Sequence, residues 1–300
     1  MTTLPFHPDT PAAPAPAQAA VPAPAPEPGG EQVGPLRHEL GAVQGLIYRD
    51  LLRLTGQRTH VALLLLNPVL YLFFLGGGLA ALIPTASLGV GYQTYLFPGM
   101  LVMTVQTPAI MVGIRLILDR QSGYLRELLM APVRRATLLL GSCAGGTVVA
   151  TVQGAVLLGL AGTVGLPYDP LLMLLLLSTM ILISFTITSL ALALAVSLAK
   201  AETFNTLLGV VMTPLLFLSG GFFPLQSLPS WAHTLAAVNP MAYGVDLLRR
   251  CIALRVPDRA AIGGIDWAGR QPPFLLEAAL LLLCGVAALL WAGHRFNRPE

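Results

Sequence analysis

Two stretches of the sequence hold most of the residues whose types and spacing could serve a function. The first, residues 115–136, reads RLILDRQSGYLRELLMAPVRRA and carries five arginines against one aspartate and one glutamate. Its leucines recur at helical spacing, which predicts a short helix with one apolar side from Arg115 to Met130, ended by Pro132. A soluble partner could pack on that side while the arginines pair with its acidic groups. The alternative is a basic segment that only fixes the orientation of the chain.

The second stretch, residues 217–250, reads FLSGGFFPLQSLPSWAHTLAAVNPMAYGVDLLRR. Three prolines divide it into half-helices, since proline lacks the backbone donor that a helix interior needs. Non-helical backbone at membrane depth is tolerated only where it is buried in protein or lines a water-filled cavity. The pattern therefore predicts a re-entrant helical hairpin at the outer mouth of a pathway. The alternative is an interfacial loop anchored by Phe222, Phe223, Trp231 and Tyr243.

The sequence shows no enzyme signature. It has no glycine-rich phosphate loop followed by Lys-Ser/Thr, no cysteine and histidine cluster, no nucleophile elbow and no paired carboxylates inside an apolar segment. We therefore expect no catalytic residues, no metal site and no cofactor bound by this chain. The formal net charge of +3 is small, so the composition does not indicate nucleic acid binding.

The elements that must carry these stretches are six long apolar segments. A bilayer core about 30 Å thick needs about 20 helical residues to cross it, and each segment reaches or approaches that length. Charged residues make up 10% of the chain, against about 25% in an ordinary soluble domain. These features predict an all-α integral membrane protein with six transmembrane helices, at residues 61–83, 94–114, 136–165, 170–199, 206–223 and 273–293.

The N-terminal part of the chain divides at residue 35. Residues 11–28 are an alanine and proline repeat that favours extended polyproline II, so residues 1–35 are expected to form a disordered cytoplasmic tail. Over residues 36–58, apolar side chains recur at helical spacing among four arginines, which predicts a helix lying on the membrane surface. Residues 36–300 are expected to form one transmembrane domain.

Basic residues predict the orientation of the chain. Lysine and arginine collect in cytoplasmic loops, and the predicted inner segments hold most of the arginines while the first two outer turns hold none. Both termini of this multi-pass protein are therefore predicted on the cytoplasmic side of an inner (plasma) membrane. Residues 224–272 are the exception, because they should lie outside yet contain five arginines, which Asp246, Asp258 and Asp266 offset only in part.

Few polar groups lie inside the predicted spans. Asn67, Gln106 and Gln153 are the candidates for lining a pathway. Ionisable residues within spans mark ion or proton routes, and the nearest case is Glu277, close to the start of the last span. We therefore expect no ion-driven transport, and the energy for any uphill transport must come from another protein.

The two stretches together resemble the membrane subunit of ABC-2-type transporters, the permease family that includes daunorubicin-resistance and nodulation-factor exporters. The first stretch matches the family form E/D-R-x-x-G-x-x-x-x-L-x-x-x-P-v-x-R through Asp119, Arg120, Gly123, Leu128, Pro132 and Arg135. The second matches a longer and more specific motif through Ser219, Gly221, Phe222, Phe223, Pro224, Leu225, Leu228, Pro229, Trp231, Asn239, Pro240, Tyr243, Asp246, Leu248 and Arg249. Met241-Ala242 departs from the commoner Leu-Thr. The likeness covers about residues 36–295.

The resemblance implies the permease subunit of an exporter that is driven by a separate ATP-binding subunit, which would hold ATP and Mg²⁺. It implies a coupling helix that docks into this subunit through Arg120, Gly123, Arg126, Glu127, Leu128 and Pro132. It implies an outer gate formed by Gly221, Phe222, Phe223, Pro224, Pro229, Asn239, Pro240, Asp246 and Arg249. Two copies of the ATP-binding subunit and a second permease chain, identical or homologous, would complete the complex in membrane lipid.

The apolar spans favour a drug-like or lipid-like amphipathic substrate that is moved outward. Export of a polysaccharide or lipid-linked glycan by the same family is the alternative. A non-transporting membrane scaffold is the alternative from another class. The sequence leaves open the identity of the substrate, the choice between homodimer and heterodimer, and the role of the tail.

Overall fold

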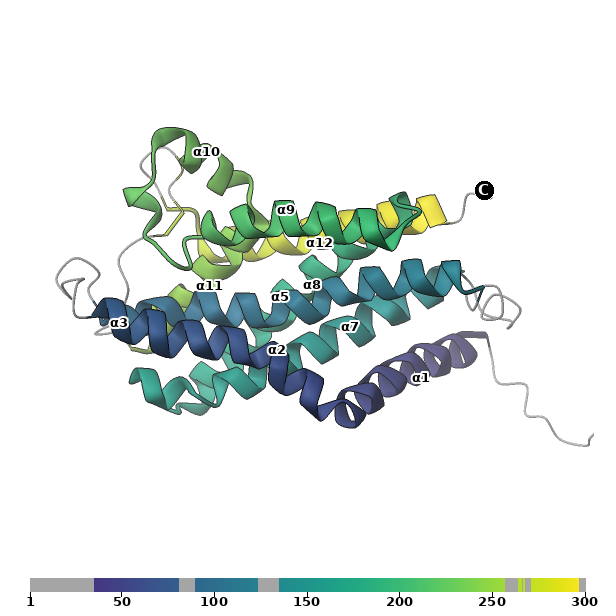
Figure 1. Cartoon of the computed structure of the whole chain (residues 1–300), viewed down its shortest axis with the longest axis horizontal. Helices are drawn as coiled ribbons and strands as arrows, with labels where there is room; N and C mark the ends of the chain where they lie inside the picture. The colour runs from purple at the N-terminus through teal and green to yellow at the C-terminus, as the bar shows by residue number, and fades with distance from the viewer. Residues whose placement is uncertain are drawn as a thin grey trace, which may run out of the picture.

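The regular structure is helical throughout the part of the chain that the structure describes. This computed structural model describes residues 35–80, 90–123, 135–256, 264–265, 267 and 271–296. Most of the long helices run along the long axis of the molecule (Figure 1). The elements are α1 (Pro35–Gly56), α2 (Arg58–Leu70), the π-helix η1 (Tyr71–Leu75), α3 (Gly76–Ala80), α5 (Tyr92–Gln121), α7 (Arg135–Leu158), the 3-10 helix η2 (Ala161–Val164), α8 (Pro170–Ser197), α9 (Ala201–Phe217), the 3-10 helix η3 (Leu225–Ser227), α10 (Ser230–Val238), α11 (Pro240–Arg255) and α12 (Phe274–Phe296).

Five helical stretches among the described residues are long and apolar enough to cross a membrane. They are Arg58–Ala80, Tyr92–Gln121, Arg135–Leu158, Pro170–Ser197 and Phe274–Phe296. They correspond to the first four predicted spans and the last, so the all-helical fold and these five helices are confirmed. The predicted fifth span is represented by α9, which has 17 residues and ends at Phe217 instead of residue 223.

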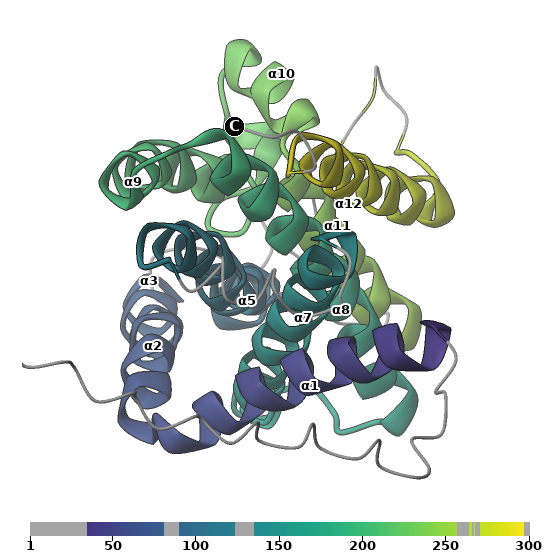
Figure 2. The ribbon, with the colours of Figure 1, turned by 90° about the vertical axis from the view of Figure 1, so that its right-hand side faces the viewer.

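The centre of the bundle is formed by α5, α7 and α8. In each of these helices, between 50% and 56% of the most apolar 18-residue segment is buried. The corresponding share is 17% for Arg58–Ala80 and for α12. The outer helices therefore expose most of their apolar surface. Figure 2 looks along the long axis and shows α7 and α8 in the middle, α2 on the left, and α9 and α12 at the top.

Two helices begin with the same N-capping motif, an Asp or Asn residue followed by proline. The side chain of Asp169 accepts a hydrogen bond from the Leu171 N–H at 3.1 Å, and Asn239 Oδ1 accepts one from the Met241 N–H at 3.0 Å. Proline at the first helical position has no N–H to leave unsatisfied, and its fixed φ suits a helix. The sequence thus sets where α8 and α11 start.

Side-chain contacts show which helix ends lie together. At one end, Gln121 Nε2 in the last turn of α5 donates to the carbonyl oxygen of Ala199, just after α8, at 3.1 Å. At the other end, Arg255 Nε in the last turn of α11 donates to the Asp169 carboxylate at 2.8 Å. The C-terminus of α11 therefore lies beside the turn that leads into α8.

Helix α1 lies across one end of the bundle and is seen lengthwise in Figure 2, whereas α2 is seen nearly end-on. It packs on α7 through two glycines, one helical turn apart. A Cβ atom on Gly141 would lie 2.4 Å from Cδ1 of Leu46, and one on Gly145 would lie 2.6 Å from Oδ2 of Asp50. Small residues at this spacing let the two helices approach closely.

One further boundary differs from the prediction, and one span contains an irregular turn. The predicted span 136–165 ends as an α-helix at Leu158, and after a 3-10 turn Gly165 adopts a left-handed φ of +77°. In the first span the helix continues through its three glycines, and the irregularity is the π-helix Tyr71–Leu75, which follows Pro68. Proline removes a backbone donor, and the ladder of hydrogen bonds shifts register after it.

Candidate functional site

The turn after α9, residues 218–223, packs against α5 backbone to backbone. Gly220 has a φ of +75°, in the left-handed region that favours glycine. A Cβ atom on Gly99 of α5 would lie 2.6 Å from Cα of Gly221, and one on Gly221 would lie 2.8 Å from Cα of Gly99. Glycine is therefore needed at both positions for the turn to sit this close to the helix.

Two tyrosines of α5 and one arginine of α11 bind the carbonyl groups of this turn. Tyr95 Oη donates to the Gly220 oxygen at 2.9 Å, and Tyr92 Oη donates to the Phe222 oxygen at 3.1 Å. The Arg249 guanidinium donates to the same Gly220 oxygen and lies over the Tyr95 ring, 4.2 Å from its centroid. Arg249 is only 5% exposed, so the carbonyl and the ring face compensate part of the cost of burying its charge.

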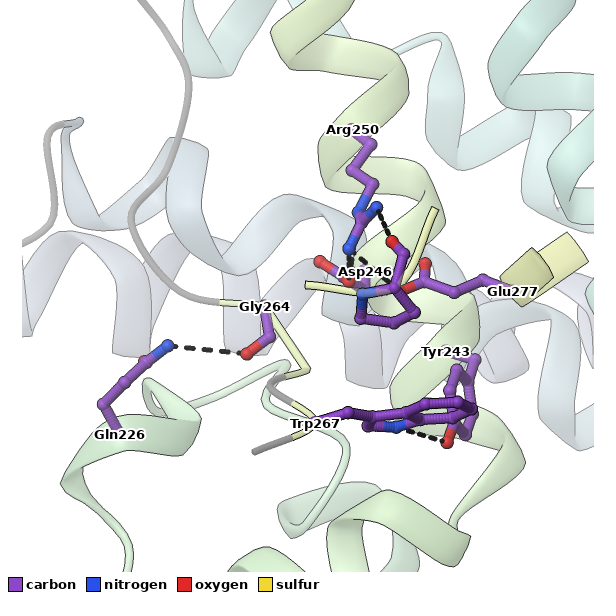
Figure 3. Close-up of polar contacts among 8 residues, drawn as sticks. Gln226, Tyr243, Asp246, Arg250, Gly264, Trp267 and Glu277 are labelled. Atoms are coloured by element: carbon purple, nitrogen blue, oxygen red, sulfur yellow. Dashed lines mark hydrogen bonds and ion pairs between the residues drawn. The ribbon is translucent and has the colours of Figure 1, made fainter. Parts of the chain in front are cut away.

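The neighbouring Arg250 joins two carboxylates on different helices (Figure 3). Its Nη2 lies 2.9 Å from Asp246 Oδ2 on α11 and 2.9 Å from Glu277 Oε1 on α12. Its Nη1 also donates to the carbonyl oxygen of Pro272. Both carboxylates are buried. One arginine thus compensates two buried carboxylates and holds the start of α12 against α11.

Asn239 and Tyr243 make the polar contacts that fix the ends of α10 and α11. Asn239 lies between these helices, and its Nδ2 donates to the Leu215 oxygen of α9 at 2.6 Å. Tyr243 Oη donates to the Ala237 oxygen at 2.6 Å and accepts a hydrogen bond from Trp267 Nε1 at 3.2 Å (Figure 3). Burial raises the pKa of the Tyr243 hydroxyl, which stays neutral and able to donate.

The predicted gate residues all lie at this end of the molecule. Phe222 is buried and stacks on Phe217 with ring centroids 5.0 Å apart, whereas Phe223 is 42% exposed. The prolines lie where helices begin: Pro224 before η3, Pro229 before α10 and Pro240 at the first position of α11. Asp246 and Arg249 belong to two different contacts, the Arg250 cluster and the glycine turn. Their role in gating stays a prediction.

The three residues predicted to line a pathway lie in three different places. Asn67 borders an open hollow on the surface of α2 and η1, together with Tyr71 and Phe74. Gln153 lines a separate cavity enclosed by α1, α2, α5 and α7. Gln106 is buried and borders neither of these two. A single copy of the described chain therefore does not bring the three side chains into one channel.

Only part of the predicted coupling helix falls within the described residues. Arg120 lies in the last turn of α5, and Gly123 follows it with a left-handed φ of +78°. Arg126, Glu127, Leu128 and Pro132 lie outside the described residues. The assignment of this loop to partner binding stays a prediction.

Sequence reasoning missed the contribution of Tyr92, Tyr95 and Arg250. The two tyrosines are three residues apart, which places both hydroxyls on one face of α5, and a buried tyrosine hydroxyl usually finds a partner. Arg250 lies four residues after Asp246, the spacing of a helical ion pair. These spacings indicate local pairs, but neither identifies the glycine turn or Glu277 as the distant partner.

The long apolar helices, joined by buried polar contacts near their ends, define a polytopic helical membrane protein. A sequence model of the ABC-2 type transporter family matches residues 41–252, more than half of the chain. The chain belongs to the ABC-2 type transporter family, as the resemblance in the two motifs suggests. The family assignment makes it a membrane component of a transport system.

Named relatives align over most of their own length. The chain is 30% identical to Nodulation protein J of Rhizobium leguminosarum bv. trifolii over 188 residues, 62% of this chain and 71% of that protein. It is 28% identical to Nodulation protein J of Rhizobium leguminosarum bv. viciae over 221 residues, 72% of this chain and 84% of the relative. It is also 28% identical to the transport permease ycf38 of Pyropia yezoensis over 215 residues, 68% of this chain and 71% of that protein.

Proposed function

We propose that this chain is the membrane-spanning subunit of an ATP-driven exporter. The observation that carries the proposal is the family match over residues 41–252, which includes the glycine turn and Arg249. ATP and Mg²⁺ would be bound by two copies of a separate subunit. A second permease chain, identical or homologous, would complete the transport unit.

In the proposed arrangement the chain crosses an inner (plasma) membrane six times. The arginine-rich end of the bundle (the basic end) faces the cytoplasm. Helix α9 is about 25 Å long at 1.5 Å per residue, and the turn at residues 218–223 extends its reach. Both termini would be cytoplasmic, with α1 on the membrane surface and α10 and α11 at the outer side. Arg249, Arg250 and Arg255 all bind groups within the fold. Because their charges are compensated within the fold, these arginines are only weak evidence against placing residues 224–272 on the outer side.

The glycine turn at 218–223 is the proposed outer gate. It connects α9 to the helices α10 and α11, and it is bound by α5 through Tyr92 and Tyr95. A movement of α5 relative to α11 would stretch the two bonds that share the Gly220 oxygen. Rigid-body movement of the helices by ATP-driven partners could then open and close this end.

The proposed substrate is a drug-like or lipid-like amphipathic molecule. Large apolar side chains such as Phe74 and Leu283 are exposed on the outer helices, where lipid, a second permease chain or an apolar substrate would cover them.

One experiment tests this proposal together with its two alternatives, export of a glycan and a non-transporting scaffold. The chain is purified in mild detergent from its native host, and co-purifying proteins are identified.

An ATP-binding subunit should co-purify, and its ATPase activity should rise with amphipathic compounds in proteoliposomes. Stimulation only by lipid-linked glycans would favour glycan export. If no nucleotide-binding protein co-purifies and ATP drives no transport, the exporter proposal is wrong and the scaffold is favoured.

The coupling segment has its own test. Replacing Glu127 and Leu128 together by alanine should abolish ATP-dependent export and leave membrane insertion intact, because the partner loses its contact. The matched control is Glu202→Ala, which removes an exposed carboxylate from the first turn of α9, at the same end of the bundle. Normal export by the double variant would contradict the assignment.

A further inference from the structure

A cavity of about 310 Å³ lies at the basic end of the bundle, where α1 meets α2 against α5 and α7. It is remote from the glycine turn, which packs on the opposite end of α5. Its volume is within the range of ligand sites in proteins. None of the functional roles proposed above uses it as a whole.

The mouth of this cavity carries more positive than negative charge. Arg53, Arg115 and Asp50 line it, together with His60. Within the described part of the chain, the side chain of Asp50 forms hydrogen bonds only with the adjacent Arg49, at 3.3 and 3.4 Å. Arg53 Nη1 and Arg115 Nη1 are 3.8 and 3.5 Å from Asp50 Oδ1, at ion-pair distance without a hydrogen bond. The two guanidinium groups therefore keep donors that an anion can use.

Two further groups make the cavity wall polar. Gln153 is 3% exposed and lines the cavity, and its Oε1 has no hydrogen-bond partner among the residues that the structure describes. An unpaired buried acceptor is costly and favours a ligand with a hydroxyl donor. Gln57, the N-cap residue of α2, also lines the cavity.

The rest of the lining is apolar, from the buried Pro108 and Val149 to the half-exposed Leu118. A free inorganic anion would leave this surface uncovered. A molecule with an anionic head, a hydroxyl group and an apolar tail would satisfy all three kinds of wall, and a bilayer supplies such molecules directly.

We propose that this cavity is a binding site for the headgroup of a resident anionic phospholipid, of the phosphatidylglycerol type. The phosphate bridges Arg53 of α1 and Arg115 of α5, the glycerol hydroxyl donates to Gln153 Oε1, and the first methylenes cover the apolar wall. The lipid thereby holds α1 against the bundle. The inference uses the membrane location of the chain and does not depend on ATP-driven export.

Native mass spectrometry of the delipidated full-length chain tests the site without any ATP-binding partner. Phosphatidylglycerol should bind at least about tenfold more tightly than phosphatidylcholine, the scale of one charge-assisted contact. The double variant Arg53→Gln, Arg115→Gln should lose this preference. Arg295→Gln is the matched control, because Arg295 lies at the same end but faces Trp291, 5.7 Å from its ring centroid.

Two variants keep the test decisive if the double arginine variant fails to fold. Val149→Phe fills the cavity with apolar volume and should abolish tight binding, whereas Gln153→Leu should bind phosphatidylglycerol and phosphatidic acid equally. Equal binding of phosphatidylglycerol and phosphatidylcholine to the wild type would overturn the proposal, as would displacement by inorganic phosphate alone. Export of the bound lipid on ATP addition to the assembled complex would also overturn its resident character.

Discussion

Replacing Gly99 by alanine tests the close contact between α5 and the glycine turn. The added Cβ would lie 2.6, 2.8 and 2.9 Å from the Cα, O and C atoms of Gly221. All three are backbone atoms, so no side-chain rotation can relieve the contact. The turn must move away from α5, which lengthens the hydrogen bonds from Tyr95 and Arg249 to the Gly220 oxygen.

The expected magnitude follows from two opposing effects. Alanine is better than glycine inside a helix by about 1 kcal/mol, whereas overpacking a tight contact costs about 1–3 kcal/mol. Gly99→Ala should therefore lower the free energy of unfolding by about 0–2 kcal/mol. Among the described residues, no atom outside the backbone of α9 lies within 4 Å of the position that a Cβ on Gly209 would take. Gly209→Ala should accordingly gain up to about 1 kcal/mol.

The assay compares thermal unfolding of the two variants and the wild type in the same detergent. Gly209→Ala should melt at or above the wild type, and Gly99→Ala should melt below Gly209→Ala. Export activity, where reconstituted, should fall only for Gly99→Ala, because only that change displaces the proposed gate. A Gly99→Ala protein as stable as Gly209→Ala would refute the backbone contact as a constraint.

Two further predictions concern ion pairs. Arg250→Leu leaves Asp246 and Glu277 buried without their cation and should cost about 3–5 kcal/mol. Neutralising both carboxylates in the same chain should recover much of that loss in a melting experiment, and a single variant that melts like the wild type would contradict the role of the cluster. The hydrogen bond from Arg255 lowers the pKa of the Asp169 carboxyl below its ordinary value. The stabilisation is therefore present above about pH 4 and is lost as the pH falls through the lowered pKa. Asp169→Asn keeps the helix cap, so the difference from wild type should be constant near neutral pH and vanish in acid.

Much of the fold follows from local sequence patterns. The apolar segments predict the membrane helices, and the Asp-Pro and Asn-Pro pairs mark where α8 and α11 begin. Helix ends were harder to predict, since apolar residues continue beyond Leu158 and Phe217 although the α-helices stop there. A run of apolar residues shows that a segment is hydrophobic, but where its helix ends depends on the geometry of the turn that follows.

The candidate site shows the same division. The motif around residues 219–249 identifies the important segment, but not that Arg249 and Arg250 bind different partners. Adjacent residues on a helix point about 100° apart, and what each meets depends on which helices pack around it. Tyr95 precedes Gly220 by 125 residues, so no local pattern connects them.

The sequence by itself determined that the chain is helical and membrane-embedded, and it identified the family through two motifs. Hydrophobic length and proline position are local properties, and they act before any tertiary contact forms. Only the tertiary structure decided that Gly99 faces Gly221, that Arg250 joins Asp246 to Glu277, and that Arg53 and Arg115 meet at one cavity. These contacts join segments far apart in the chain, and packing in three dimensions fixes which side chains meet.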